Sequence, residues 1–138
     1  VASNTEVADI LRDYRDYTMI CAGVFDDMVA TLVLENKEAI LKRNRQIVEE
    51  NLALMDAWIA KEPKASWIRP ASVSTSFVKL DVNRPIEDFA LELLQDYGVL
   101  VVPGNRFDKE SHVRIGYCCD KEVLQKGLEK LSQFLNKC

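Results

Sequence analysis

Apolar residues in the N-terminal half of this 138-residue chain recur mostly at three- and four-residue steps, the spacing that gathers side chains on one face of a helix. Ser3 and Glu6 form a capping-box pattern that predicts a short helix from Ser3, its N-cap, to about Tyr14. Residues 25–34 predict a second helix, which Asn36 can end. The first half of the chain is therefore predicted to be helical.

A third and much longer helix is predicted for residues 37–60. It would be about 36 Å long, comparable to the diameter of a small domain, and a helix of this length usually bridges two bodies. An isolated coiled coil is the alternative. Asn44 and Asn51 interrupt the apolar stripe, and only about three heptads are present, so a coiled coil fits less well.

After Pro63 the pattern changes to short runs typical of strands. Residues 73–80 are rich in β-branched and aromatic residues, and their alternation places Val78 and Leu80 opposite Phe77. Residues 99–102 are four consecutive apolar residues closed by Pro-Gly, which predicts a short buried strand and a turn.

Residues 112–117 alternate and predict a further strand. One face carries Val113, Ile115 and Tyr117, and the other carries His112, Arg114 and Gly116. Two helices complete the set: one begins near Pro85 and ends at Gly98, and the last is capped by Asp120. The fold class is therefore α/β in an α+β arrangement, with a small mixed or antiparallel sheet and helices packed on one of its faces.

We divide the chain into connecting helices (residues 1–36), a long linking helix (37–60) and a small C-terminal α/β domain (61–138). Composition is ordinary for a globular protein, at 48% hydrophobic and 29% charged residues. A net charge of −4 without a basic cluster argues against a nucleic-acid partner, whose phosphates a binding protein must neutralise. No apolar run is long enough to span a membrane and no signal peptide opens the chain, so we expect no membrane partner.

The four cysteines suggest neither a disulfide framework nor a metal site, because no C-x-x-C is present and Cys118 and Cys119 are adjacent. A reduced, cytoplasmic setting is expected. The chain begins with Val rather than Met, which suggests a fragment or a processed chain. The one histidine, His112, is expected to be a rim residue or a partly buried polar residue, and a minor role beside Arg114 stays open.

Arg114 is the candidate that carries chemistry. An arginine in the middle of a strand needs an anionic partner or water, since an unpaired buried charge is costly. Two interpretations remain: a surface arginine on an exposed sheet face, or a planar fork that holds a carboxylate at two points.

The segments VPGNRF (residues 102–107) and VRI (113–115) resemble the C-terminal part of class I/II aminotransferases, the pyridoxal-phosphate enzymes of the aspartate-aminotransferase (fold type I) superfamily. The resemblance implies that Arg114 binds the substrate's α-carboxylate. It also implies that the long helix joins a cofactor-binding large domain to this small domain. Tyr17 and Thr18, in a segment interpreted as an extended connection, would lie near the cofactor or the dimer seam and are weaker candidates.

The family's cofactor lysine stands in an S-x-S-K motif followed by Gly-x-Arg, and no lysine of this chain has that context. The resemblance therefore implies a severed small domain, inactive and without bound cofactor by itself. Its parent would be a homodimeric enzyme that uses pyridoxal phosphate, an amino acid and a 2-oxo acid. Two alternatives stay open: a non-enzymatic carboxylate-binding or regulatory module, and a helical interaction domain in which residues 37–60 bind a partner.

Overall fold

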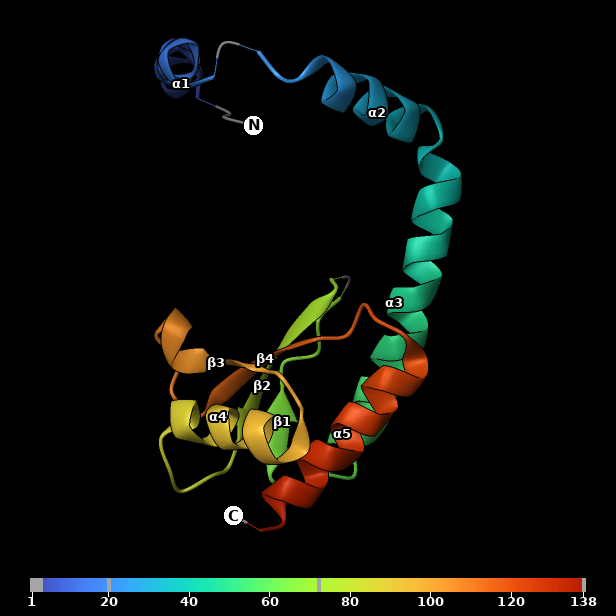
Figure 1. Ribbon diagram of the computed structural model, residues 1–138, viewed down its shortest axis with the longest axis vertical. Coiled ribbons are helices and arrows are strands. Elements are labelled where there is room, and N and C mark those ends of the chain that lie inside the picture. The colour runs from blue at the N-terminus through green and yellow to red at the C-terminus, as the bar shows by residue number, and fades with distance from the viewer. Residues whose placement is uncertain (1–3, 20, 72, 138) are drawn as a thin grey trace. The chain divides into compact units, whose positions relative to one another are not determined.

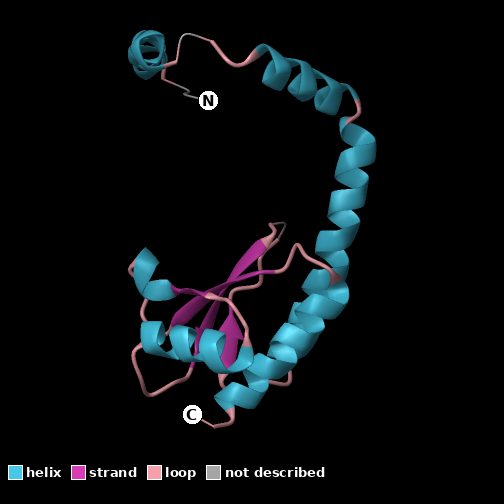
Figure 2. Cartoon of the chain, in the orientation of Figure 1, coloured by secondary structure: helices cyan, strands magenta, loops and turns pink. Residues whose placement is uncertain are grey.

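The computed structural model of the chain describes residues 4–19, 21–71 and 73–137. Helices dominate, and the strands gather into one small sheet (Figures 1 and 2). The chain divides into two compact units, residues 1–41 and 42–138. The elements, in chain order, are α1 (Thr5–Thr18), α2 (Val24–Glu35), α3 (Lys37–Ile59), β1 (Ala65–Trp67), β2 (Thr75–Leu80), α4 (Ile86–Tyr97), β3 (Val102–Pro103), the 3-10 turn η1 (Gly104–Phe107), β4 (His112–Gly116) and α5 (Lys121–Leu135).

Helix α1 differs from its prediction at both ends. Asn4 caps it, since the Asn4 side-chain oxygen accepts hydrogen bonds from the amides of Glu6 and Val7 at 2.9 and 3.3 Å. The predicted cap, Ser3, lies outside the described residues. The helix continues to Thr18, whose hydroxyl donates to the Tyr14 carbonyl at 3.0 Å. The extended connection predicted from Tyr17 was therefore wrong for Tyr17 and Thr18, which lie in the last turn of α1.

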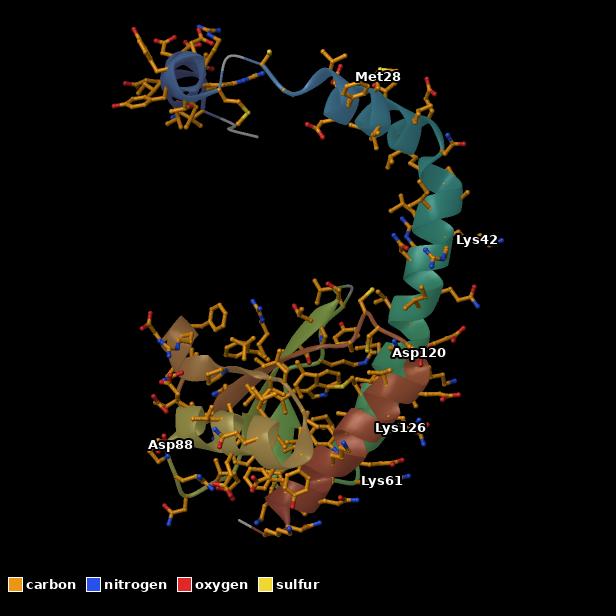
Figure 3. All side chains as sticks on the ribbon, viewed as in Figure 1. Met28, Lys42, Lys61, Asp88, Asp120 and Lys126 are labelled. Atoms are coloured by element: carbon orange, nitrogen blue, oxygen red, sulfur yellow. The ribbon has the colours of Figure 1, made fainter. Side chains whose placement is uncertain are left out.

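Helix α2 ends where predicted, because the Asn36 side chain donates to the Leu32 carbonyl at 2.8 Å. No residue of α1 or α2 is buried. The apolar side chains of α2 are exposed along its whole length, and Figure 3 labels Met28 among them.

Helix α3 confirms the predicted long helix to within one residue. The contacts of its second half account for Asn51, one of the two asparagines that interrupt the apolar stripe of this helix. Asn51 is only 2% exposed, and its side-chain amide donates to the carbonyls of Tyr117 and Cys119 at 2.7 and 2.8 Å. Asn51 thereby joins α3 to the segment that leaves β4.

The sheet is antiparallel throughout, in the order β1-β2-β4-β3. Val78 and Leu80 of β2 are fully buried and Phe77 is half-buried on the other face, as predicted. β2 begins at Thr75, two residues later than predicted. β1 was missed, because its three residues were taken as a lead-in to β2.

The strand predicted for residues 99–102 was wrong in extent, since β3 holds only Val102 and Pro103. The helix before it explains the difference. Gly98 ends α4 in the left-handed conformation, as predicted, and the amide of Val99 donates back to Leu93. The backbone of Val99 therefore still closes the helix, and pairing with β4 begins only at Val102.

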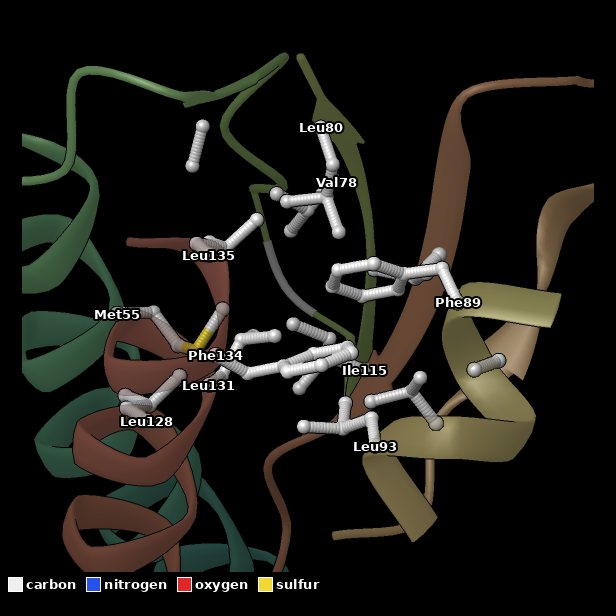
Figure 4. Close-up of a cluster of buried hydrophobic side chains, with 14 of the residues drawn as sticks. Met55, Val78, Leu80, Phe89, Leu93, Ile115, Leu128, Leu131, Phe134 and Leu135 are labelled. Carbon is white, nitrogen blue, oxygen red and sulfur yellow. The ribbon is translucent and has the colours of Figure 1, made fainter. Parts of the chain in front are cut away.

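The core lies on one face of the sheet, where α4, α5 and the second half of α3 contribute side chains (Figure 4). Asp120, labelled in Figure 3, caps α5 as predicted by accepting from the amides of Glu122 and Val123 at 2.9 and 3.3 Å. Leu94 of α4 and Val123 of α5 are apolar side chains that stay exposed. The fully buried core side chains are Met55, Val78, Leu80, Ile86, Phe89, Leu93, Val113, Tyr117, Leu131 and Leu135.

Removing the Asn51 side chain is expected to destabilise the chain by about 1–3 kcal/mol, because two carbonyls would lose a buried donor. Asn51→Ala should lower the midpoint of urea unfolding accordingly. Asn44→Ala is the matched control, since Asn44 is exposed on the same helix; its effect should stay within about 0.7 kcal/mol. Equal midpoints for the two variants would contradict this role of Asn51.

Candidate functional site

Arg114 lies in the middle of β4, on the face of the sheet away from the core. Its neighbours in β4, Val113 and Ile115, point into the core and are 0% and 7% exposed, whereas Arg114 is exposed. Phe77 of β2 and Val102 of β3 stand directly opposite Arg114 on either side. Directly opposite residues in an antiparallel pair have close Cβ atoms, so the stem of Arg114 lies between two apolar neighbours.

The guanidinium lies beside an aromatic cluster. The carbon atom of the Arg114 guanidinium lies over the ring of Phe107, 5.2 Å from the ring centroid. Phe107 meets Phe77 edge to face, with centroids 5.6 Å apart and planes at 85°. The His112 ring stacks on Phe77, with centroids 5.7 Å apart and planes at 26°. Among the described residues, no carboxylate forms an ion pair with Arg114.

Phe107 reaches this position through a tight loop. The turn predicted at Pro103-Gly104 is one turn of 3-10 helix, η1, which begins at Gly104 itself. A Cβ atom on Gly104 would lie 2.3 Å from the Lys109 carbonyl oxygen and 2.6 Å from that of His112. Only glycine allows this approach, and the Lys109 amide donates to the Gly104 carbonyl at 3.0 Å. The close approach folds η1 onto β4 and places Phe107 beside Arg114.

The same loop is tied to α4. Glu87 accepts hydrogen bonds from Asn105, at 2.8 Å, and from Arg106, with which it also forms an ion pair. The Arg106 and Glu87 side chains are 63% and 46% exposed. The two arginines of the motif therefore differ, because Arg106 has a carboxylate partner and Arg114 has an aromatic one.

The predicted site residues fall into both units. Arg114 and His112 share one face of β4 and are linked through Phe77 and Phe107. His112 Nδ1 lies 2.8 Å from the Glu110 carbonyl oxygen. Tyr17 and Thr18 are exposed side chains of α1, in the first unit.

Sequence reasoning missed Phe77 and Phe107 as parts of the site. Phe107 belongs to the motif that singled out Arg114, but the motif does not reveal that its ring faces the guanidinium. Phe77 was assigned to the correct face of its strand. Its place directly opposite Arg114 depends on the register of β2 with β4, and the hydrophobic pattern excludes a shift of one residue in that register but not a shift of two.

Other features of the described residues carry less chemistry. None of the described lysines is buried. No group of three or more His, Cys, Asp and Glu side chains in the described ranges could hold a metal ion. Within those same ranges, no helix has both the length and the apolar character needed to cross a membrane. A hollow of about 630 Å³ lies between α5 and residues 98–101, and Arg114 is not in its lining.

Sequence comparison decides the family. The profile described as "Aminotransferase class I and II" matches residues 1–131, which is nearly the whole chain. The chain belongs to the class I and II aminotransferase family. This result confirms the resemblance seen in the VPGNRF and VRI segments.

Two curated relatives of this aminotransferase-family chain are similar over nearly all of it. Capreomycidine synthase of Streptomyces vinaceus is 28% identical over 130 residues, 94% of this chain and 33% of that protein. A probable N-acetyl-LL-diaminopimelate aminotransferase of Bacillus subtilis is 26% identical over 141 residues, 96% of this chain and 34% of that protein. The chain thus spans about a third of the length of these relatives.

A solved structure shares both sequence and fold. It is a PLP-dependent aminotransferase from Streptococcus suis, 65% identical to this chain, with a TM-score of 0.91 over 99% of this chain and 36% of that one. This chain therefore corresponds to about a third of that structure.

Gly104→Ala is expected to destabilise the chain by about 1–3 kcal/mol, because the new methyl group would overlap two carbonyl oxygens and force the loop to shift. Gly127→Ala is the matched control. Nothing lies within 4 Å of a Cβ atom at Gly127, which is inside α5. There alanine should stabilise the chain by about 0.5–1 kcal/mol. Urea unfolding of both variants tests this, and shifts of the same sign would show that the loop is not so closely packed.

Proposed function

We propose that this chain is the C-terminal domain of a pyridoxal-phosphate-dependent aminotransferase, and that Arg114 binds the α-carboxylate of its substrate. The parent would transfer an amino group between an amino acid and a 2-oxo acid. One observation carries the proposal: in the described residues, the Arg114 guanidinium has no carboxylate partner and rests on an aromatic ring. Its N–H groups are therefore available to a carboxylate, which a guanidinium can hold at two points.

The domain organisation fits this role. Residues 61–138 would form the small domain, residues 37–60 the helix that joins it to a large domain, and residues 1–36 connecting helices. The exposed apolar side chains of α1 and α2 support the proposal, since such surfaces normally mark interfaces. The remainder of the parent and a second subunit would cover them.

The cofactor would be held by the rest of the parent. A Schiff-base lysine is activated by burial or by a neighbouring cation, and the described lysines offer no buried amine. The residues present here therefore do not fit pyridoxal phosphate, and this chain contributes substrate binding instead. We propose a homodimer for the parent, as the resemblance implies, and a cytoplasmic setting, as the cysteine pattern favours.

Ring formation is the second candidate activity, because one curated relative is named capreomycidine synthase and a structure with a TM-score of 0.83 is described as a PLP-dependent cyclase. A carboxylate-binding arginine would serve either reaction. Transamination is favoured because the relative with 65% identity is described as an aminotransferase. Product analysis of the parent enzyme, as a 2-oxo acid or as a ring, separates the two.

The purified 138-residue chain is expected to form no specific Schiff base. Pyridoxal phosphate followed by borohydride reduction should label its lysines weakly and without selectivity, because the described lysines are at least partly exposed and none is buried. Peptide mapping by mass spectrometry gives the measurement. Stoichiometric labelling of one lysine would contradict the assignment of the cofactor site to the rest of the parent.

In the parent enzyme, Arg114→Ala is expected to remove about 2–5 kcal/mol of transition-state stabilisation, as when one side of a hydrogen-bonded ion pair in a partly desolvated site is lost. That is roughly a 30-fold to few-thousand-fold loss in kcat/KM for an amino acid. Arg114→Lys should recover only part of it, because an ammonium cannot make the planar two-point contact.

Arg106→Ala is the matched control, since Arg106 belongs to the same motif and its ion pair with Glu87 is exposed. Its loss should cost about 0–1 kcal/mol. Amines without a carboxylate should be nearly insensitive to Arg114→Ala. The proposal fails if Arg114→Ala leaves kcat/KM for the amino acid within about threefold of wild type, or if it affects these amines equally.

A further inference from the structure

We propose that Phe107 is a positioning residue, which holds the Arg114 guanidinium in the orientation that binds a carboxylate. The inference rests on the proposed role of Arg114 and extends it to a residue that does not itself meet the substrate. The two side chains are in contact, with the Arg114 guanidinium carbon 5.2 Å from the centroid of the Phe107 ring.

An aromatic ring can hold a guanidinium in place and still leave its N–H groups free to bind a carboxylate. The five N–H donors of arginine lie in the plane of the guanidinium. A partner that attracts the cation through its π surface uses none of these donors. An acidic partner would occupy them, as Glu87 does for Arg106.

The surroundings of Phe107 show that the ring is not there to fill the core. Phe107 is 45% exposed and does not belong to the cluster of buried apolar residues. It contacts Phe77 edge to face, and Phe77 stands directly opposite Arg114 in the sheet. Phe107 is thus fixed against the strand that flanks the arginine.

The loop also holds the Phe107 backbone. Gly104 at the start of η1 packs against the Lys109 and His112 carbonyls, and the residues between Gly104 and Phe107 are bonded to Glu87 of α4. Long charged side chains lose rotamer freedom when they are ordered. A ring fixed in advance lets Arg114 be ordered before substrate arrives.

The test uses the parent holoenzyme and two substrates, its preferred amino acid and the amine that lacks the carboxylate. Phe107→Leu should lower kcat/KM for the amino acid about three- to tenfold, mainly through KM, the range expected for one cation–π contact. It should change kcat/KM for the amine less than about twofold. Phe107→Tyr, which keeps the ring, should stay within about twofold of wild type for both substrates.

A double-mutant cycle separates positioning from a structural effect. In an Arg114→Ala background, Phe107→Leu should cause no further loss for the amino acid, because nothing remains to be positioned. Equal losses for both substrates, or an undiminished loss in that background, would overturn the inference and leave the role of Arg114 intact. If Arg114→Ala alone has no effect, the proposed function fails first and this inference fails with it. Should Phe107→Leu not fold, Phe107→Met serves in its place under the same criteria.

Discussion

The constraint on which this structure depends is the two-residue period of β4 in the middle of an antiparallel sheet. Val113, Ile115 and Tyr117 fill the core against the helices, and Val113 stands directly opposite the equally buried Val78. A slip of one residue would carry all three to the other face and bring Arg114 into the core. Burying an unpaired guanidinium there would cost far more free energy than any new apolar contact could return. The buried apolar residues and the arginine therefore exclude a one-residue shift together.

Elements outside the sheet maintain that register at both ends of β4. Before the strand, Gly104 allows η1 to lie against the backbone of Lys109 and His112. After the strand, Asn51 of α3 donates to the carbonyls of Tyr117 and Cys119, and Asp120 then starts α5. Burial raises the pKa of the Tyr117 phenol above its ordinary value, and its hydroxyl donates to the Val73 carbonyl. Gly104, Asn51 and Asp120 thus support a strand whose own side-chain contacts are mostly apolar.

The sequence predicted what depends on strong local signals. The long helix, the cap at Asp120, the left-handed Gly98 and the two faces of residues 112–117 all follow from periodicity or from residue types with one preferred place. The failures lie where tertiary contacts decide. β1 has only three residues, and Ala65 is a strand residue because it pairs with Leu80. Val99 looks like a strand residue, yet its amide closes α4. Thr18 stays helical because its hydroxyl bonds back to Tyr14.

Of the candidate site, the sequence singled out Arg114 but not the aromatic residues beside it. Arg114 stood out because a charge interrupts an apolar strand. Phe107, five residues before β4, and Phe77, on another strand, become its neighbours only through the loop and the register.

The kind of neighbour matters for chemistry. At 4 Å and an effective dielectric constant of about 20, a carboxylate beside Arg114 would attract it by about 4 kcal/mol. A substrate carboxylate would have to compete with that attraction. An aromatic ring contributes about 0.5–2 kcal/mol and leaves the positive charge uncompensated. On the proposed role of Arg114, an aromatic support therefore orders the side chain while keeping most of its electrostatic attraction for the substrate.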